Sequence, residues 1–285
     1  MWILFAFGSA FFAGITSILA KYGMKEIESR VATAVRTTVV FFFSCAMVWF
    51  TGSWAAIAKI DAKNFVFLVS SGFATGASWL CYFHALHIGE VGKVVAIDKS
   101  STVLTMLMAF ILLGESVTAW GIFCIGAIAA GTYLMVRSNV GQPIKKRGDQ
   151  WFLYASLSAV FASLTPILGK VGIQNIDSNV GTTVRTAVVL LMAWGIVLFP
   201  KKRYVLKVSN RDILFLCLSG VATGASWLCF YKALRDGPAS VVIPVDKLSI
   251  LITIGFAYIV FGEILTKRSL LGLVLIVSGT LALLI

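Results

Sequence analysis

The chain has 285 residues, of which 59% are hydrophobic and 13% are charged, and its formal net charge is +12. Soluble domains are about 45–50% apolar and about 25% charged, so this composition excludes an ordinary soluble protein and indicates a polytopic membrane protein. The positive charge does not call for nucleic acid as a partner, because basic loops are also typical of the cytoplasmic side of membrane proteins.

Ten apolar runs are each long enough to cross a bilayer, which takes about 20 residues of helix. We predict spanning helices over residues 2–21, 31–51, 65–86, 91–113, 118–136, 151–171, 180–199, 213–234, 239–261 and 269–285. The sequence therefore predicts an all-α membrane protein. Its parts are a first five-helix repeat at 1–137, a basic linker at 138–150 and a second five-helix repeat at 151–285.

The two halves of the chain resemble each other in sequence, and both copies keep the same charged residues. The repeated features are the segment 74–81, which returns unchanged as 222–229, and the pairs Arg36 and Arg185, Asp98-Lys99 and Asp246-Lys247, and Gly114-Glu115 and Gly262-Glu263. Because each copy has five helices, the second copy must enter the membrane from the opposite side, so we predict inverted repeats. Repeats of this kind are typical of secondary transporters, whose site lies where the two repeats meet.

The distribution of basic residues between the loops predicts an orientation. The connections after the odd-numbered helices contain thirteen Lys and Arg, and the opposite face contains three. The positive-inside rule places the richer face in the cytoplasm and both termini outside. We therefore expect an integral protein of the bacterial inner membrane, surrounded by lipid. The sequence predicts no oligomeric state, and we expect the monomer to be functional.

The doublets Asp98-Lys99 and Asp246-Lys247 lie about a third of the way into the fourth and ninth predicted helices. Ionisable residues at that depth are costly and normally face a cavity or a partner. Two interpretations stay open: an interhelical ion pair, for instance between Asp98 and Arg36, or a polar site for substrate or a coupling proton. Since adjacent residues do not face each other on a helix, we expect the Asp and Lys of one doublet to reach different neighbours.

Arg36 and Arg185 lie five residues into the second and seventh predicted helices. A guanidinium group makes forked contacts with carboxylate or phosphate, which makes both arginines candidates for substrate binding. From that depth the side chain can also snorkel to the membrane interface or pair with an Asp. One Arg, one Asp and one Lys leave each half with one net positive charge, which favours a substrate with an anionic group.

Four aromatic residues of the third and eighth predicted helices, Trp79, Tyr82, Trp227 and Tyr231, are further candidates for the substrate site. An aromatic wall beside charged groups suits an organic molecule with apolar and polar parts, or a cationic head group. Small residues surround these aromatics, and close packing of helices is the alternative role for this part of the chain.

Glu115 and Glu263 each follow a glycine at the ends of the fourth and ninth predicted helices, and we expect turn or gating contacts from them. Pro244 lies two residues before Asp246, where a proline frees a backbone carbonyl and bends the helix, so it is a third candidate gating residue.

Neither a metal nor a cofactor is predicted. The five cysteines all lie in apolar runs, without the spacing of a metal site or a disulfide framework. The two histidines lack the further ligands that zinc requires. Coupling to a gradient of protons or another ion stays open.

Several of these features together resemble the EamA family of the drug/metabolite transporter (DMT) superfamily. They are the ten helices in two repeats, the short loops, an early Lys-x-Gly, a Gly-rich third helix and Gly-Glu at the ends of the fourth and ninth helices. The resemblance implies a central cavity between the halves, lined chiefly by the third, fourth, eighth and ninth helices. The Asp-Lys doublets are not a general mark of that family.

We therefore predict a secondary active transporter that moves small polar metabolites, amino-acid-like or other organic solutes, by alternating access. Export is the leading direction, and import of a metabolite or an organic cation is the alternative. In this mechanism Asp98 and Asp246 hold a coupling proton or an amine, and the cations hold an anionic group or neutralise the aspartates. An intramembrane aspartic protease also has two aspartates, but a neighbouring lysine favours the ionised form of each, so we predict no enzyme.

Overall fold

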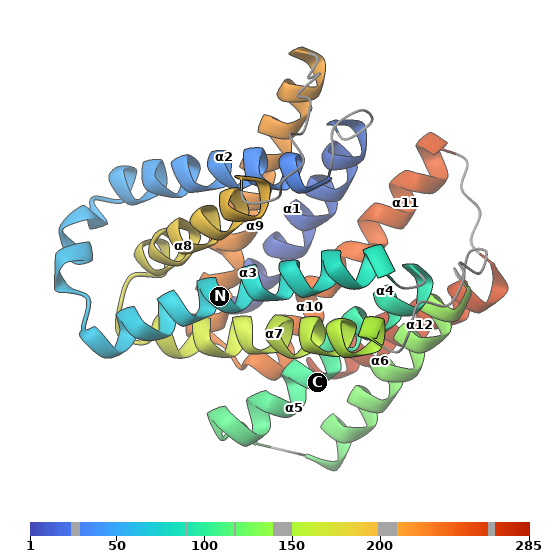
Figure 1. Ribbon diagram of the computed structural model, residues 1–285. Coiled ribbons are helices and arrows are strands. Elements are labelled where there is room, and N and C mark those ends of the chain that lie inside the picture. The colour runs from blue at the N-terminus through green and yellow to red at the C-terminus, as the bar shows by residue number, and fades with distance from the viewer. Residues whose placement is uncertain (24–28, 89–90, 117, 139–149, 199–209, 262–265) are drawn as a thin grey trace.

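The computed structural model describes residues 1–23, 29–88, 91–116, 118–138, 150–198, 210–261 and 266–285. Every regular element in these ranges is a helix (Figure 1). The helices are α1 (Trp2–Gly23), α2 (Ser29–Phe50), η1 (Ser53–Lys59), α3 (Ala62–Ile88), α4 (Val91–Lys99), α5 (Ser101–Leu113), α6 (Ala119–Ser138), α7 (Gln150–Gly172), α8 (Ser178–Leu198), α9 (Asn210–Asp236), α10 (Ala239–Lys247), α11 (Ser249–Phe261) and α12 (Lys267–Ala282). The predicted all-helical class is confirmed.

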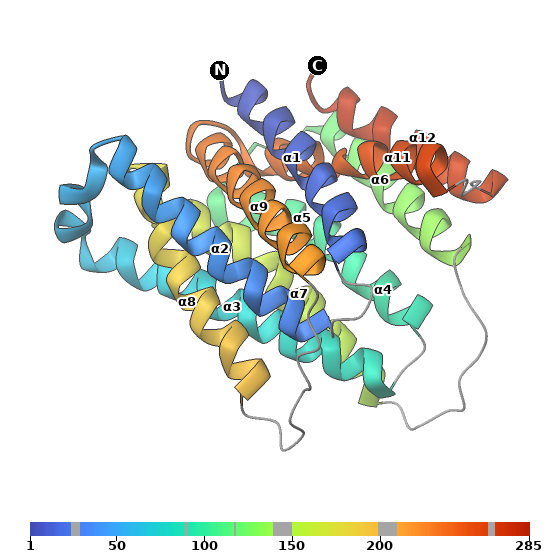
Figure 2. The ribbon, with the colours of Figure 1, turned by 90° about the horizontal axis from the view of Figure 1, so that it is seen from above.

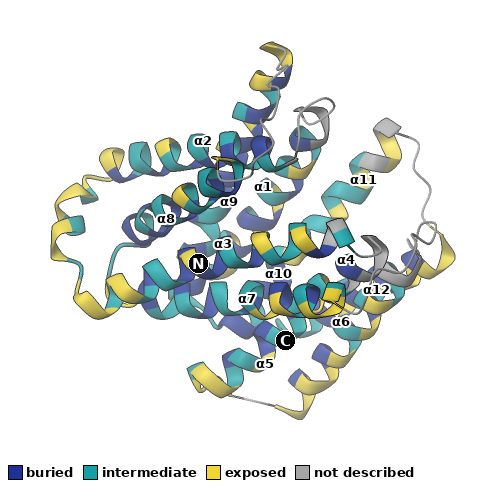
Figure 3. Cartoon of the chain, in the orientation of Figure 1, coloured by how far each residue is buried: buried dark blue, intermediate teal, exposed yellow. Residues whose placement is uncertain are grey.

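Seven segments of the described chain are long and apolar enough to cross a membrane. They are Trp2–Ala20, Arg30–Phe50, Ala62–Ala85, Gln150–Gly172, Ser178–Leu198, Asn210–Asp236 and Ala239–Phe256. Each corresponds to one of the predicted spans, while the apolar stretch of α6, Ala119–Met135, is shorter and α12 has only 16 residues. Exposed residues recur along many of the helices (Figure 3). They include large apolar side chains such as Phe50 and Ile259, as expected for a protein surrounded by lipid.

The fourth and ninth predicted helices each contain a break directly after the Asp-Lys doublet, at Ser100 and Leu248, whereas only a bend at Pro244 was predicted. At the first break the N–H of Ser100 donates to the carbonyl of Ile97 over 3.1 Å. At the second the N–H of Leu248 donates to the carbonyl of Val245 over 3.0 Å. These bonds span three residues instead of four, which tightens the backbone for one turn. Pro244, buried inside α10, further removes one helical donor there.

Helices of the two halves are interleaved. The most extensive helix contacts join α1 to α9 and α3 to α7, so the first helix of each half packs along the third helix of the other (Figures 1 and 2). Both interfaces carry the same serine contact. The Ser226 hydroxyl donates to the carbonyl of Ser9 over 3.0 Å, and the Ser78 hydroxyl donates to the carbonyl of Ser158 over 3.1 Å.

The last helices of the two halves, α6 and α12, pack on each other through glycines (Figure 2). A Cβ atom added to Gly131 would lie 2.6 Å from the carbonyl oxygen of Gly272, and one added to Gly272 would lie 2.6 Å from the carbonyl oxygen of Gly131. The backbones therefore touch at this crossing, which only residues without a side chain permit.

Candidate functional site

A cavity of about 470 Å³ lies at the level of the two helix breaks and takes its lining from both halves of the chain. The lining includes all the predicted substrate or coupling residues except Arg36, namely Trp79, Tyr82, Asp98, Lys99, Arg185, Trp227, Tyr231, Asp246 and Lys247. Polar and apolar side chains both contribute to the wall, which suits a small organic molecule rather than a bare ion.

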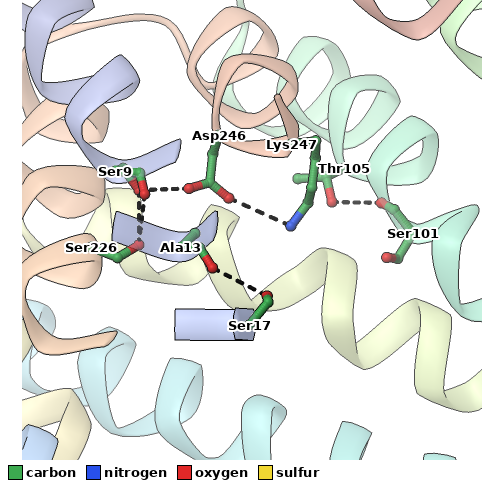
Figure 4. A network of polar contacts seen from close by, with 8 residues as sticks. All are labelled: Ser9, Ala13, Ser17, Ser101, Thr105, Ser226, Asp246 and Lys247. Atoms are coloured by element: carbon green, nitrogen blue, oxygen red, sulfur yellow. Dashed lines mark hydrogen bonds and ion pairs between the residues drawn. The ribbon is translucent and has the colours of Figure 1, made fainter. Parts of the chain in front are cut away.

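Asp246 is held from two sides at the end of α10 (Figure 4). The Ser9 hydroxyl of α1 donates to its Oδ1 over 2.5 Å, and the Lys247 Nζ lies 3.6 Å from its Oδ2. The expectation that the two members of a doublet reach different neighbours is thus wrong for this pair. Although the Cα–Cβ bonds diverge, the long lysine side chain folds back toward the neighbouring carboxylate, and about half of that side chain stays exposed.

Asp98 is held in the same way by the other half. The Ser158 hydroxyl of α7 donates to its Oδ1 over 3.1 Å. Its neighbour Lys99 is exposed, and its ammonium has no hydrogen bond or ion pair among the described residues. An ion pair of Asp98 with Arg36, one of the two interpretations of the sequence, is not formed between these two described side chains.

Arg185 is buried in the wall of the cavity, with only 3% of its surface exposed. Its Nε donates to the hydroxyl of Ser71 over 3.0 Å, and its Nη2 donates to that of Thr75 over 2.7 Å, so α3 of the opposite half fixes the guanidinium. The group lies 4.8 Å from the ring centre of Trp227 and 5.0 Å from that of Tyr231, in cation–π contact with both. The side chain therefore points into the protein and does not snorkel to the interface.

Arg36, the repeat counterpart of Arg185, has different surroundings. It is half-buried, it does not line the cavity, and the described part of the chain offers it no hydrogen bond. The counterparts of the two hydroxyls that hold Arg185 are Ser219 and Thr223, which contact Thr16 of α1 as Ser71 and Thr75 contact the equivalent Thr165 of α7. Within the described residues, only Ser71 and Thr75 also accept from a guanidinium. Two arginines with equivalent places in the sequence are thus used differently in this conformation.

Glu115, predicted to be a gating residue, joins the two halves at one end of α5. Its Oε1 accepts from the Lys170 ammonium over 2.8 Å and from the N–H of Ala239 over 2.6 Å, and its Oε2 accepts from the N–H of Ser240 over 2.9 Å. It thereby caps the N-terminus of α10, where a negative charge is stabilising. Burial alone would raise the pKa of Glu115, but the hydrogen bonds from Lys170 and the α10 backbone hold it below its ordinary value. Glu263 lies outside the described residues.

Replacing Glu115 with Gln is expected to destabilise the protein by roughly 1.5–3 kcal/mol, because the charge-assisted bonds to Lys170 and α10 are lost. A carboxyl with a lowered folded-state pKa stabilises fully above its ordinary pKa of 4.5 and loses that contribution as the pH falls through the folded value. The difference in thermal stability between the wild type and E115Q should therefore be constant from about pH 8 to pH 5 and shrink only below that range. The exposed Asp61→Asn is the control. If the difference in thermal stability between the wild type and E115Q already disappears near neutral pH, the assigned contacts of Glu115 are contradicted.

The sequence prediction missed the hydroxyl residues that hold the charged groups. Ser9 and Ser158 occupy matching positions in the two copies, and so do Ser71 and Ser219. The recurrence of these serines in both copies could therefore have identified them as candidate partners of the charged residues. In the described residues no cluster of three or more His, Cys, Asp or Glu side chains could hold a metal ion.

Residues 1–137 and 149–285 each match the EamA-like transporter family. A Sinorhizobium protein named an uncharacterized transporter is 39% identical over 134 residues, which is 47% of this chain and 95% of that protein. An uncharacterized protein of Methanocaldococcus jannaschii is 27% identical over 88 residues, which is 31% of this chain and 64% of that protein. A crystal structure described only as that of a protein superposes with a TM-score of 0.80 at 15% identity, covering 99% of this chain and 96% of the other. That last similarity concerns the fold.

Proposed function

Because the chain belongs to the EamA-like transporter family, we propose that this membrane transporter is a secondary active exporter of small polar metabolites. The observation that carries the proposal is the cavity at the helix breaks, into which both halves send charged and aromatic side chains. Broken helices whose ends meet at a polar site are the usual construction of substrate sites in secondary transporters.

Duplicated contacts support the alternating-access mechanism. Ser9 holds Asp246 and Ser158 holds Asp98, so each half supplies the hydroxyl that fixes the carboxylate of the other half. This arrangement fits two five-helix repeats of inverted topology, which exchange conformations and move the opening of the cavity from one side to the other. The proposal places the protein in the bacterial inner membrane as a functional monomer, with both termini outside.

Binding in the cavity must favour one state over the other for transport to occur. We assign this role to the aspartate–serine contacts, which a proton or a substrate amine can replace. The Glu115–Lys170 ion pair serves as the contact that closes one end, since it joins α5 of the first half to α7 and α10 of the second.

Flux through purified protein in liposomes tests the proposal. Amino acids and other small metabolites would first be screened by thermal shift, and each hit would then be followed as radiolabelled counterflow at two pH values. We expect saturable counterflow for at least one hit, and acceleration by a pH gradient if protons are the coupling ion. Ligands that bind without any flux contradict transport and favour a sensor. Loading the label on one side at a time distinguishes export from import.

A further inference from the structure

The charged groups of the cavity differ in how many of their hydrogen-bonding atoms have partners. Both carboxylates already have donors: Asp98 accepts from Ser158, and Asp246 accepts from Ser9 with Lys247 beside its second oxygen (Figure 4). Each carboxylate therefore already has one hydroxyl donor, although an ionised carboxylate can accept further hydrogen bonds.

Arg185 is in the opposite condition. Its Nε and Nη2 are bonded to Ser71 and Thr75, but its Nη1 is buried and has no hydrogen-bond partner among the described residues. A buried N–H of a charged group without an acceptor is unfavourable, and such a group is satisfied when a water, an ion or a ligand binds beside it. The guanidinium also packs against the rings of Trp227 and Tyr231, 4.8 and 5.0 Å from their centres.

Two lysines add to this excess of positive charge. Lys99 has no hydrogen bond or ion pair in the described part of the chain, and its ammonium is repelled by Lys247 and attracted by Asp98. The cavity therefore holds three cations and two carboxylates, and the two carboxylates are already hydrogen-bonded. An anion placed there would supply the missing acceptor and relieve the repulsion between the lysines.

We propose that the cavity binds an organic carboxylate with an apolar or aromatic body, whose carboxylate is received by Arg185 and Lys99. Phe230, Trp227 and Trp79 line the same cavity and offer the apolar surface for the body of the ligand. The substrate class rests on the proposed transport function, but binding of the anion can be measured without transport.

Three probes that share one body test the inference: 3-phenylpropionate, its neutral amide and phenethylamine. In thermal-shift titrations of the purified full-length protein, 3-phenylpropionate should stabilise in a saturable way. Its apparent affinity should exceed that of the amide and of the amine by at least about fivefold, because only the carboxylate supplies an anionic acceptor to the cations. Arg185→Gln should abolish the stabilisation by 3-phenylpropionate. Arg36→Gln is the matched control, since it removes the sequence counterpart outside the cavity, and it should keep that stabilisation.

Lys99→Gln keeps the test valid if Arg185→Gln does not fold, because the Lys99 side chain is exposed and makes no hydrogen bond that the fold requires. It should weaken 3-phenylpropionate binding at least about threefold. The inference is overturned if the amine binds in preference to the carboxylate, if neither variant weakens binding, or if the carboxylate gives no saturable shift. Counterflow of a solute without a carboxylate would leave the transport function standing while this inference fails. Carboxylate binding that depends on Arg185 but produces no flux would support this inference while the transport function fails.

Discussion

Replacing Asp246 with Asn is expected to slow transport at least about tenfold while leaving a folded, monodisperse protein. The carboxylate accepts from Ser9 of α1 and lies beside Lys247, so its charge connects the end of α10 to the other half of the protein. Asparagine has the same size but no charge, and it can neither take up a coupling proton nor balance the lysine. Counterflow in liposomes at matched protein content measures the effect, and gel filtration reports the folded state.

Asp98→Asn is expected to show the same loss, because Asp98 occupies the equivalent place in the first half and accepts from Ser158. Asp61→Asn makes the same chemical change at an exposed position outside the cavity and should leave flux unchanged. Unimpaired flux in both cavity variants would exclude these aspartates from transport. Loss of folded protein would instead indicate that their contacts are structural.

The largest loss of stability is expected from Gly131→Leu. The backbones of α6 and α12 touch at this crossing, and a Cβ atom at position 131 would lie 2.6 Å from the carbonyl oxygen of Gly272. Because the obstacle is backbone and not a flexible side chain, the two helices must separate. We expect a destabilisation of roughly 3 kcal/mol or more, seen as a lower melting temperature or a loss of monodisperse protein.

Gly126→Leu is the matched control, since it makes the same substitution on the same helix where an added Cβ would have no neighbour within 4 Å. Its melting temperature should stay close to that of the wild type. Equal stability of the two variants would contradict the close packing of α6 on α12.

Composition and hydropathy predicted the helical membrane fold, because a spanning helix must bury its own backbone hydrogen bonds within an apolar run of fixed length. The break after Lys99 was not predicted, and near Lys247 only a bend at Pro244 was expected. A single turn that shifts from four-residue to three-residue bonding leaves the apolar run unchanged, and no proline marks the first break.

The repeat located most of the candidate site, because charges kept in both copies inside the membrane are costly without a cavity. It could not predict that Arg185 is enclosed by Ser71 and Thr75 while Arg36 is not. The two copies have equivalent sequences, which predict equivalent contacts for the two arginines. In one conformation of the protein the two halves are arranged differently, so their contacts differ. The fold back of Lys247 toward Asp246 was missed for another reason, since helix geometry fixes the direction of Cβ but not of a long flexible side chain.

The interleaving of the two halves has a consequence for biosynthesis. A ribosome completes α1 and α3 before α7 and α9 exist, yet those later helices are the packing partners of the earlier ones. The hydroxyls of Ser71 and Ser78 donate to carbonyls of α7, so these two hydrogen bonds cannot form before α7 has been inserted. The first half therefore lacks the main packing partners of α1 and α3 until the second half has been made. Two separately translated halves should accumulate stably only when they are made in the same cell.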